Sequence, residues 1–222
     1  QRTRRIASGA CDGSFVLYWM RTALRAHDNP ALDAALAAGD ELGVPVFVYH
    51  GLSERYPHAS DRHHTFILEG ARDVQEQLVA RGLGTAFHLE RPGQEGDHLV
   101  TLGALAALIV TEDLPVPPLT GWTRRLSERT TTPLWVVDTA CILPMMLVRE
   151  PVDRAFIFRK KYEAQRFDRL RRGWVDRPVT RPEFIPPELP FTPIDFSEQT
   201  IASLVAECRI DHEVPSGSQL KG

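Results

Sequence analysis

The sequence predicts an α/β protein: a five-stranded, parallel, doubly wound (Rossmann-like) sheet with the strand order 3-2-1-4-5. Two observations predict this fold. Up to about residue 140, short apolar runs alternate with helical patterns, and this order of elements places parallel strands side by side through right-handed crossovers. The run at 44–49 (VPVFVY) is apolar on nearly every residue, as expected of a strand that is covered on both faces.

The elements follow in order along the chain. Strands are expected at 15–19, 44–49, 85–89, 108–111 and 134–137. The first helix has clear limits, because Asn29 suits an N-cap, Pro30 suits the first helical position and Gly43 supplies a left-handed stop. The second helix runs from Ser60 or Asp61 to Gly82, and two shorter helices are expected near 94–106 and 122–129. The buried stripe of the second helix is expected to comprise Phe66, Ile67, Gly70, Val74 and Leu78.

The composition changes after Cys141. Residues 153–172 predict a long helix rich in arginine, and the stretch 149–181 holds 11 Lys/Arg against 5 Asp/Glu. Six prolines within 175–193 exclude a helix or a central strand and indicate a stiff connector, which a short helix at 197–208 follows. We therefore predict an α/β domain over 14–148, and a basic helix and proline-rich connector over 149–222.

Composition excludes several classes of protein. A net charge of −3 and a hydrophobic fraction of 43% fit a globular protein with a sizeable core rather than a wholly basic nucleic-acid module. The three cysteines are far apart and form no CxxC pair, which argues against a disulfide scaffold or a zinc ribbon and fits the reducing cytoplasm. No apolar run approaches the roughly 20 residues of a membrane span.

Common catalytic and phosphate-binding motifs are absent. The sequence has no G-x-G-x-x-G, no G-x-x-x-x-G-K-[ST] and no G-x-S-x-G. His63 and His64 are adjacent, so on a helix their rings point about 100° apart and do not readily share one ion. We interpret them as surface or helix-entry histidines and predict no metal site.

A ligand site in an open α/β sheet is expected outside the carboxyl ends of the strands, where the strand order reverses. For the predicted order, this crevice lies between the strands at 15–19 and 108–111. The candidate cofactor-binding residues that follow these two strands are Arg21, Asp28, Asn29, Thr111, Glu112 and Asp113. A purely structural role remains open for each of them: Asn29 can simply cap its helix, and Asp28 can simply pair with Arg25.

The basic helix also has two interpretations. Clustered arginines attract phosphates, which favours contact with DNA. Its apolar residues, among them Phe156, Ile157 and Phe167, instead favour a helix that packs one face on the sheet domain and the other on a further domain.

Several motifs resemble the DNA photolyase/cryptochrome family. Residues 15–21 (FVLYWMR) and 25–32 (RAHDNPAL) are similar to the opening of the family's antenna domain, and 62–70 (RHHTFILEG) to its second helix. Residues 136–144 (VVDTACILP) resemble the fifth strand and its exit, and 154–159 the segment that leaves the domain. The start and the exit look most like class II photolyases and their bacterial relatives.

The resemblance implies the antenna-domain part of a deoxyribodipyrimidine photolyase-like protein, which repairs UV-induced pyrimidine dimers in DNA with light. In that family FAD lies in a helical C-terminal domain, which this sequence is expected to lack, so the chain alone is expected to be inactive. The α/β domain can support an antenna chromophore, a deazaflavin or a folate. The implied partners are the helical FAD domain and, through the full-length protein, damaged DNA. A stand-alone nucleotide-binding module and a scaffold that binds only proteins are the alternatives.

Overall fold

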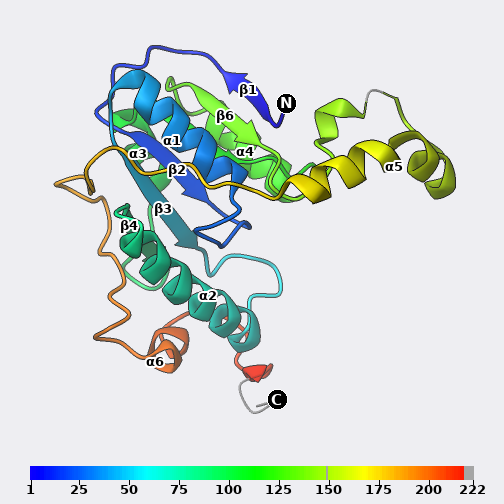
Figure 1. The fold of residues 1–222 in the computed structure, drawn as a ribbon. Coiled ribbons are helices and arrows are strands. Elements are labelled where there is room, and N and C mark those ends of the chain that lie inside the picture. The colour runs from blue at the N-terminus through cyan, green and yellow to red at the C-terminus, as the bar shows by residue number, and fades with distance from the viewer. Residues whose placement is uncertain (149, 218–222) are drawn as a thin grey trace.

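A computed structural model describes residues 1–148 and 150–217. Its centre is a six-stranded sheet with the order β1-β6-β5-β2-β3-β4 (Figure 1). The strands are β1 (Thr3–Ala7), β2 (Val16–Met20), β3 (Val46–Leu52), β4 (Gly84–Leu89), β5 (Leu108–Glu112) and β6 (Leu134–Val137). β2 to β6 pair in parallel, so the predicted class and the predicted order of these five strands are confirmed.

The sixth strand, β1, was not predicted from the sequence. It pairs antiparallel with β6 and forms one edge of the sheet. Its sequence, TRRIA, has no apolar run because an edge strand is half exposed, and charged side chains such as Arg4 and Arg5 are typical of such edges.

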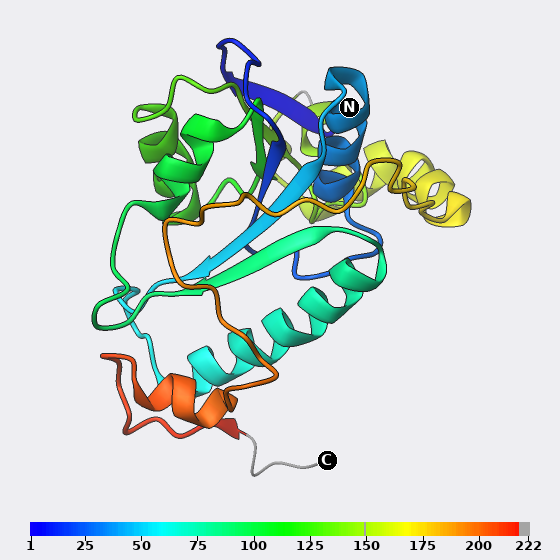
Figure 2. The same ribbon diagram turned by 90° about the vertical axis from the view of Figure 1, so that its left-hand side faces the viewer.

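Helices cover both faces of the sheet (Figures 1 and 2). The helices are α1 (Pro30–Leu42), α2 (Asp61–Ala80), α3 (His98–Leu105), α4 (Leu119–Ser127), α5 (Ala155–Arg172) and α6 (Ile201–Ala206), and a 3-10 turn spans Met145–Leu147. One apolar core lies between the sheet and α1 and α2, and a second lies between the opposite face and α3 and α4. Within the described ranges, no helix has the length and apolar character that crossing a membrane requires.

The limits of α1 are those that the sequence predicts. Asn29 caps the helix by accepting hydrogen bonds from the backbone N–H groups of Ala31 and Leu32. Pro30 is the first helical residue, and Gly43 ends the helix with φ 76°. Both signals are local, and for this reason they could be identified without knowledge of the tertiary structure.

The buried stripe of α2 differs from the predicted one. It consists of His64, Leu68, Ala71, Val74 and Leu78, whereas Phe66 is 74% exposed. The predicted burial of Val74 and Leu78 is confirmed. The first half of the stripe was predicted wrongly because a histidine, rather than an apolar residue, occupies the first buried position. His64 is also the exception to the predicted surface position of the histidine pair, since it is buried while His63 is exposed.

The proline-rich connector packs on the body of the domain. Val179 lies against the core beneath α1, and Phe184 and Phe191 lie against the core on the opposite face. The backbone N–H of Ile194 then donates to the carbonyl of Phe87 on the edge strand β4, at 2.9 Å. The connector therefore passes from one face of the sheet to the other and protects the edge that β4 would otherwise expose.

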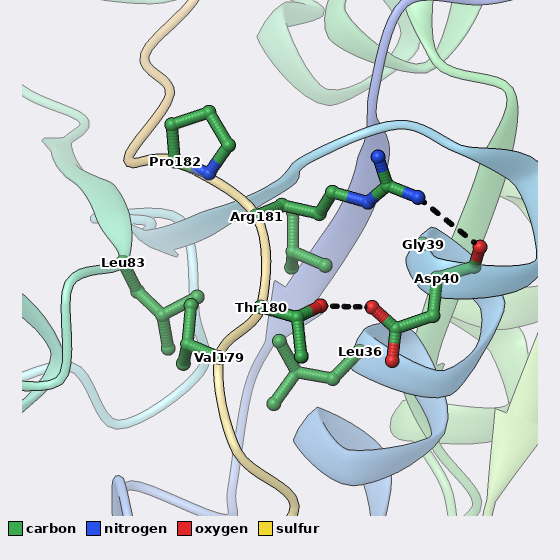
Figure 3. A pocket seen from close by; sticks show the side chains of 9 residues that line it. Leu36, Gly39, Asp40, Leu83, Val179, Thr180, Arg181 and Pro182 are labelled. Atoms are coloured by element: carbon green, nitrogen blue, oxygen red, sulfur yellow. Dashed lines mark hydrogen bonds between the residues drawn. The ribbon is translucent and has the colours of Figure 1, made fainter.

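A small cavity where the connector crosses α1 is a packing seam (Figure 3). Its volume is about 10 Å³, which is room for at most one water molecule. Leu36 and Leu83 line it on the domain side, and Thr180 and Arg181 donate to the side chain and the carbonyl of Asp40, respectively. This cavity is too small to bind a cofactor.

Candidate functional site

The predicted crevice lies at the carboxyl ends of β2 and β5, which are neighbours in the sheet. The chain after β2 continues to α1 on one face, and the chain after β5 continues to α4 on the other. Such diverging connections normally leave a gap at the edge of the sheet. Here polar side chains fill the gap, and most of them are buried.

Glu112, the last residue of β5, lies at the centre of this polar network and is fully buried. Its carboxylate accepts hydrogen bonds from the Tyr18 hydroxyl at 2.7 Å and from the backbone N–H groups of Arg21 and Thr22 at 3.0 and 3.3 Å. The guanidinium Nε of Arg21 lies 3.6 Å from Glu112 Oε2. These partners compensate for the loss of hydration of a buried carboxylate.

Arg21 extends from the end of β2 toward α4, and its side chain is only 5% exposed. It donates to the Glu112 carbonyl, to the Leu119 carbonyl at 3.2 Å and to Thr123 Oγ1 at 3.1 Å. Its guanidinium also lies 4.5 Å from the centre of the Trp19 ring. Burial lowers the pKa of Arg21 while Glu112 opposes this shift, and an arginine in such a pair remains charged.

Tyr18 and Asn29 extend the network toward α1. The Asn29 amide donates to the Tyr18 hydroxyl at 3.1 Å and to the Arg25 carbonyl at 2.9 Å. Burial, together with the adjacent Glu112 carboxylate, raises the pKa of Tyr18 well above its ordinary value. Tyr18 is therefore a neutral donor to Glu112.

The other three candidates have different surroundings. Thr111 is buried and donates to the Trp19 carbonyl at 2.8 Å, across the β2–β5 pair. Asp113 forms an ion pair with Arg4 of β1 at 3.0 Å. Asp28 is exposed, has φ 49°, and donates its backbone N–H to Asp176 of the connector at 2.8 Å. The structure thus joins Arg21, Asn29 and Glu112 in one network, with Thr111 beside it, and gives Asp28 and Asp113 other partners.

This arrangement does not fit a chromophore at the crevice. Most of the polar groups that a flavin or folate would need are bonded to one another, and the guanidinium of Arg21 occupies the space between the two connections. The exception is Arg21 Nε, which is buried without a hydrogen-bond partner among the described residues. The cofactor-binding role of the six candidates therefore stays a prediction that this geometry does not favour. Across residues 1–148 and 150–217, no cluster of three or more His, Cys, Asp or Glu side chains is placed to hold a metal ion.

Three buried histidines, His50, His64 and His88, were not identified as such from the sequence. His50 follows Val46 and Val48 on the same face of β3, and burial lowers its pKa to about 3. Burial also lowers the pKa of His64. His50 Nδ1 and both ring nitrogens of His64 have no hydrogen-bond partner among the described residues. The alternation along β3 was the signal that could have revealed the burial of His50.

The basic helix α5 extends away from the sheet domain (Figures 1 and 2). Its sequence carries seven Lys/Arg and two Asp/Glu, and its one buried residue is Tyr162. Large apolar side chains are exposed along it and just beyond it, including Phe156 (63%), Phe167 (44%), Leu170 (51%) and Val175 (86%). Exposed apolar side chains in such density are typical of interaction surfaces.

Comparisons with known proteins agree on one family. The family model described as DNA photolyase matches residues 16–180. The deoxyribodipyrimidine photo-lyase of Methanothermobacter thermautotrophicus is 32% identical over 133 residues, which are 60% of this chain and 29% of that protein. Cryptochrome-1 of Drosophila melanogaster is 41% identical over 64 residues, 28% of this chain and 12% of its own length.

A solved structure shows the same fold. The archaeal photolyase from Sulfolobus tokodaii, solved with two FAD molecules, superimposes with a TM-score of 0.55 and 12% identity. The match covers 88% of this chain and 42% of that one. The chain thus spans less than half the length of each of these proteins, and the activities of the whole proteins do not transfer with the match.

Proposed function

Since the chain belongs to the DNA photolyase family, we propose that it forms the α/β part of a deoxyribodipyrimidine photo-lyase-like protein, which repairs UV-induced pyrimidine dimers in DNA with light. The observation that carries this proposal is the family match over residues 16–180, which includes the whole parallel sheet. The named relatives do not separate class II from the other branches, so the class II assignment stays a prediction.

We propose a division of labour in which FAD and the damaged DNA bind to a helical domain outside these 222 residues. Splitting a dimer requires a flavin close to a flipped-out lesion, and flipping requires a deep pocket with groups that replace the lost stacking. The cavity beside α1 has a volume of about 10 Å³, and a surface pocket between α2 and residues 196–201 has about 400 Å³. Neither has room for both a dinucleotide flavin and a flipped-out dimer. The α/β domain over 14–148 then acts as a scaffold for the flavin-bearing domain.

The docking face of this scaffold is α5, in our proposal. Phe156 and Phe167 are exposed on a helix whose one buried residue is Tyr162. An exposed apolar helix face of this kind is stabilised when a second surface removes it from water, by roughly 25 cal/mol for each Å² buried. A stand-alone nucleotide-binding module has no need of such a face, which favours the photolyase-type assembly over that alternative.

A chimera tests the proposal. Residues 1–222 would replace the corresponding region of the Methanothermobacter photo-lyase, and FAD retention and light-dependent dimer loss would be measured. We expect the chimera to retain FAD and to repair dimers.

The docking face is tested in the same chimera. The double substitution Phe156→Glu and Phe167→Glu should reduce repair at least tenfold, whereas Phe66→Glu on the exposed face of α2 should leave it unchanged. A folded chimera that binds FAD but shows no light-dependent repair would contradict the proposed function. Equal activity of the α5 and α2 variants would contradict only the docking face.

A further inference from the structure

The strongest unassigned feature is the position of Arg21, which connects two segments that a doubly wound fold normally separates. Its backbone N–H donates to the Glu112 carboxylate on the α1 side of the sheet edge. Its guanidinium donates to Leu119 and Thr123 in the first turns of α4, on the other side. One residue thus links both diverging connections at the point where the strand order reverses.

We infer that Arg21 closes this crevice, so that the chain does not bind a planar antenna chromophore of the flavin, deazaflavin or folate class there. A ligand in that space would have to displace the guanidinium from the Trp19 ring, which lies 4.5 Å away. It would also remove the donor that Arg21 supplies to the carbonyl of Glu112, a fully buried residue. A buried acceptor without a partner is unfavourable, so the closed arrangement opposes entry.

The charges of the crevice support the same inference. Arg21 and Glu112 form a buried pair whose side chains are 5% and 0% exposed. The positive charge of Arg21 is therefore already matched, and it is not free to pair with the phosphate of a flavin nucleotide or the glutamate of a folate. Bringing an anion beside Glu112 would also add repulsion between like charges in a poorly solvated space. This inference concerns the α/β domain alone, and it holds whether or not the proposed repair function is correct.

Ligand uptake by the purified 222-residue chain is the direct test. The probes are FMN, 5-deazariboflavin and methenyltetrahydrofolate at 50 μM in equilibrium dialysis, with wild type, Arg21→Ala and Arg129→Ala. Arg129 is the matched control because it is an exposed arginine paired with Asp97. We expect no uptake at the crevice of wild type or of the control.

One equivalent of a probe bound to wild type and weakened at least tenfold by Arg21→Ala would overturn the inference. If a probe binds to wild type and to Arg21→Ala with the same affinity, it binds outside the crevice, and this result agrees with the inference.

Acrylamide quenching gives a second, independent readout. In a background with Trp122→Phe, Trp135→Phe and Trp174→Phe, the remaining fluorescence comes from Trp19, which is 8% exposed. Arg21→Ala should increase the quenching constant at least twofold, and the milder Thr123→Val, which removes one acceptor, should increase it less. A folded Arg21→Ala protein with unchanged Trp19 quenching would show that Arg21 does not close the crevice.

Discussion

Replacing Glu112 with leucine tests how far the stability of the domain depends on the network at the crevice. The substitution leaves the Arg21 guanidinium buried without its counter-ion, and it removes the acceptor of the Tyr18 hydroxyl and of two backbone N–H groups. Breaking a buried ion pair by removing one partner costs about 3–5 kcal/mol. The cost should lie near the lower limit of this range, because the Arg21 guanidinium keeps three acceptors in the variant. These are the backbone carbonyls of residues 112 and 119 and the hydroxyl of Thr123.

Urea unfolding at pH 7, followed by tryptophan fluorescence, measures this loss. Asp113→Asn is the control, since its partner Arg4 is half exposed and such surface pairs contribute about 0–1 kcal/mol. The double variant Arg21→Met with Glu112→Leu should lose less than the sum of the two single variants, because it leaves no unpaired charge. A loss below about 1 kcal/mol for Glu112→Leu, with an unchanged denaturant dependence, would refute a stabilising role of the network.

Three further predictions follow. Val48→Ala or Ile109→Ala, both at fully buried positions, should cost about 2–4 kcal/mol in urea unfolding through lost burial and a residual cavity; a loss below about 0.5 kcal/mol would contradict the core assignment. Burial lowers the pKa of His50 to about 3, so below its unfolded pKa of about 6.5 the unfolded state binds more protons than the folded state. Burial also lowers the pKa of His64 and His88, so the test is a difference: from pH 7 to pH 5 the unfolding free energy should fall by about 2 kcal/mol more in wild type than in His50→Leu, and an equal fall in both would contradict the burial of His50. Gly84→Ala should release the connector, because a Cβ there would lie 1.8 Å from the Phe184 carbonyl oxygen; proteolysis between 175 and 193 should accelerate, and unchanged cleavage would refute this contact.

Local signals in the sequence predicted much of the fold. The N-cap at Asn29, the stop at Gly43 and the apolar run at 44–49 depend on neighbouring residues, so they could be identified without the structure. β1 could not, because an exposed edge strand needs no apolar run. The buried face of α2 was mistaken because the sheet, and not the helix sequence alone, determines that His64 is buried and Phe66 exposed.

The candidate site depends even more on contacts between residues that are far apart in the sequence. Strand order alone was sufficient to bring Arg21 and Glu112 to one edge of the sheet. The sequence could not show that Glu112 is buried, because a carboxylate at a strand end is usually solvated. Nor could it show that Arg21 turns toward α4, since that contact joins segments about 100 residues apart. Whether these side chains await a ligand or fill the crevice themselves is thus a property of the tertiary structure.

The central claim is that these 222 residues form a scaffold and that the flavin chemistry takes place outside them. Its most direct test adds FAD to the purified chain and exposes dimer-containing DNA to near-UV and blue light, with retained flavin and remaining dimers both measured. The account predicts no stoichiometric FAD retention and no light-dependent loss of dimers. Retention of one FAD per chain together with light-dependent dimer loss would contradict it.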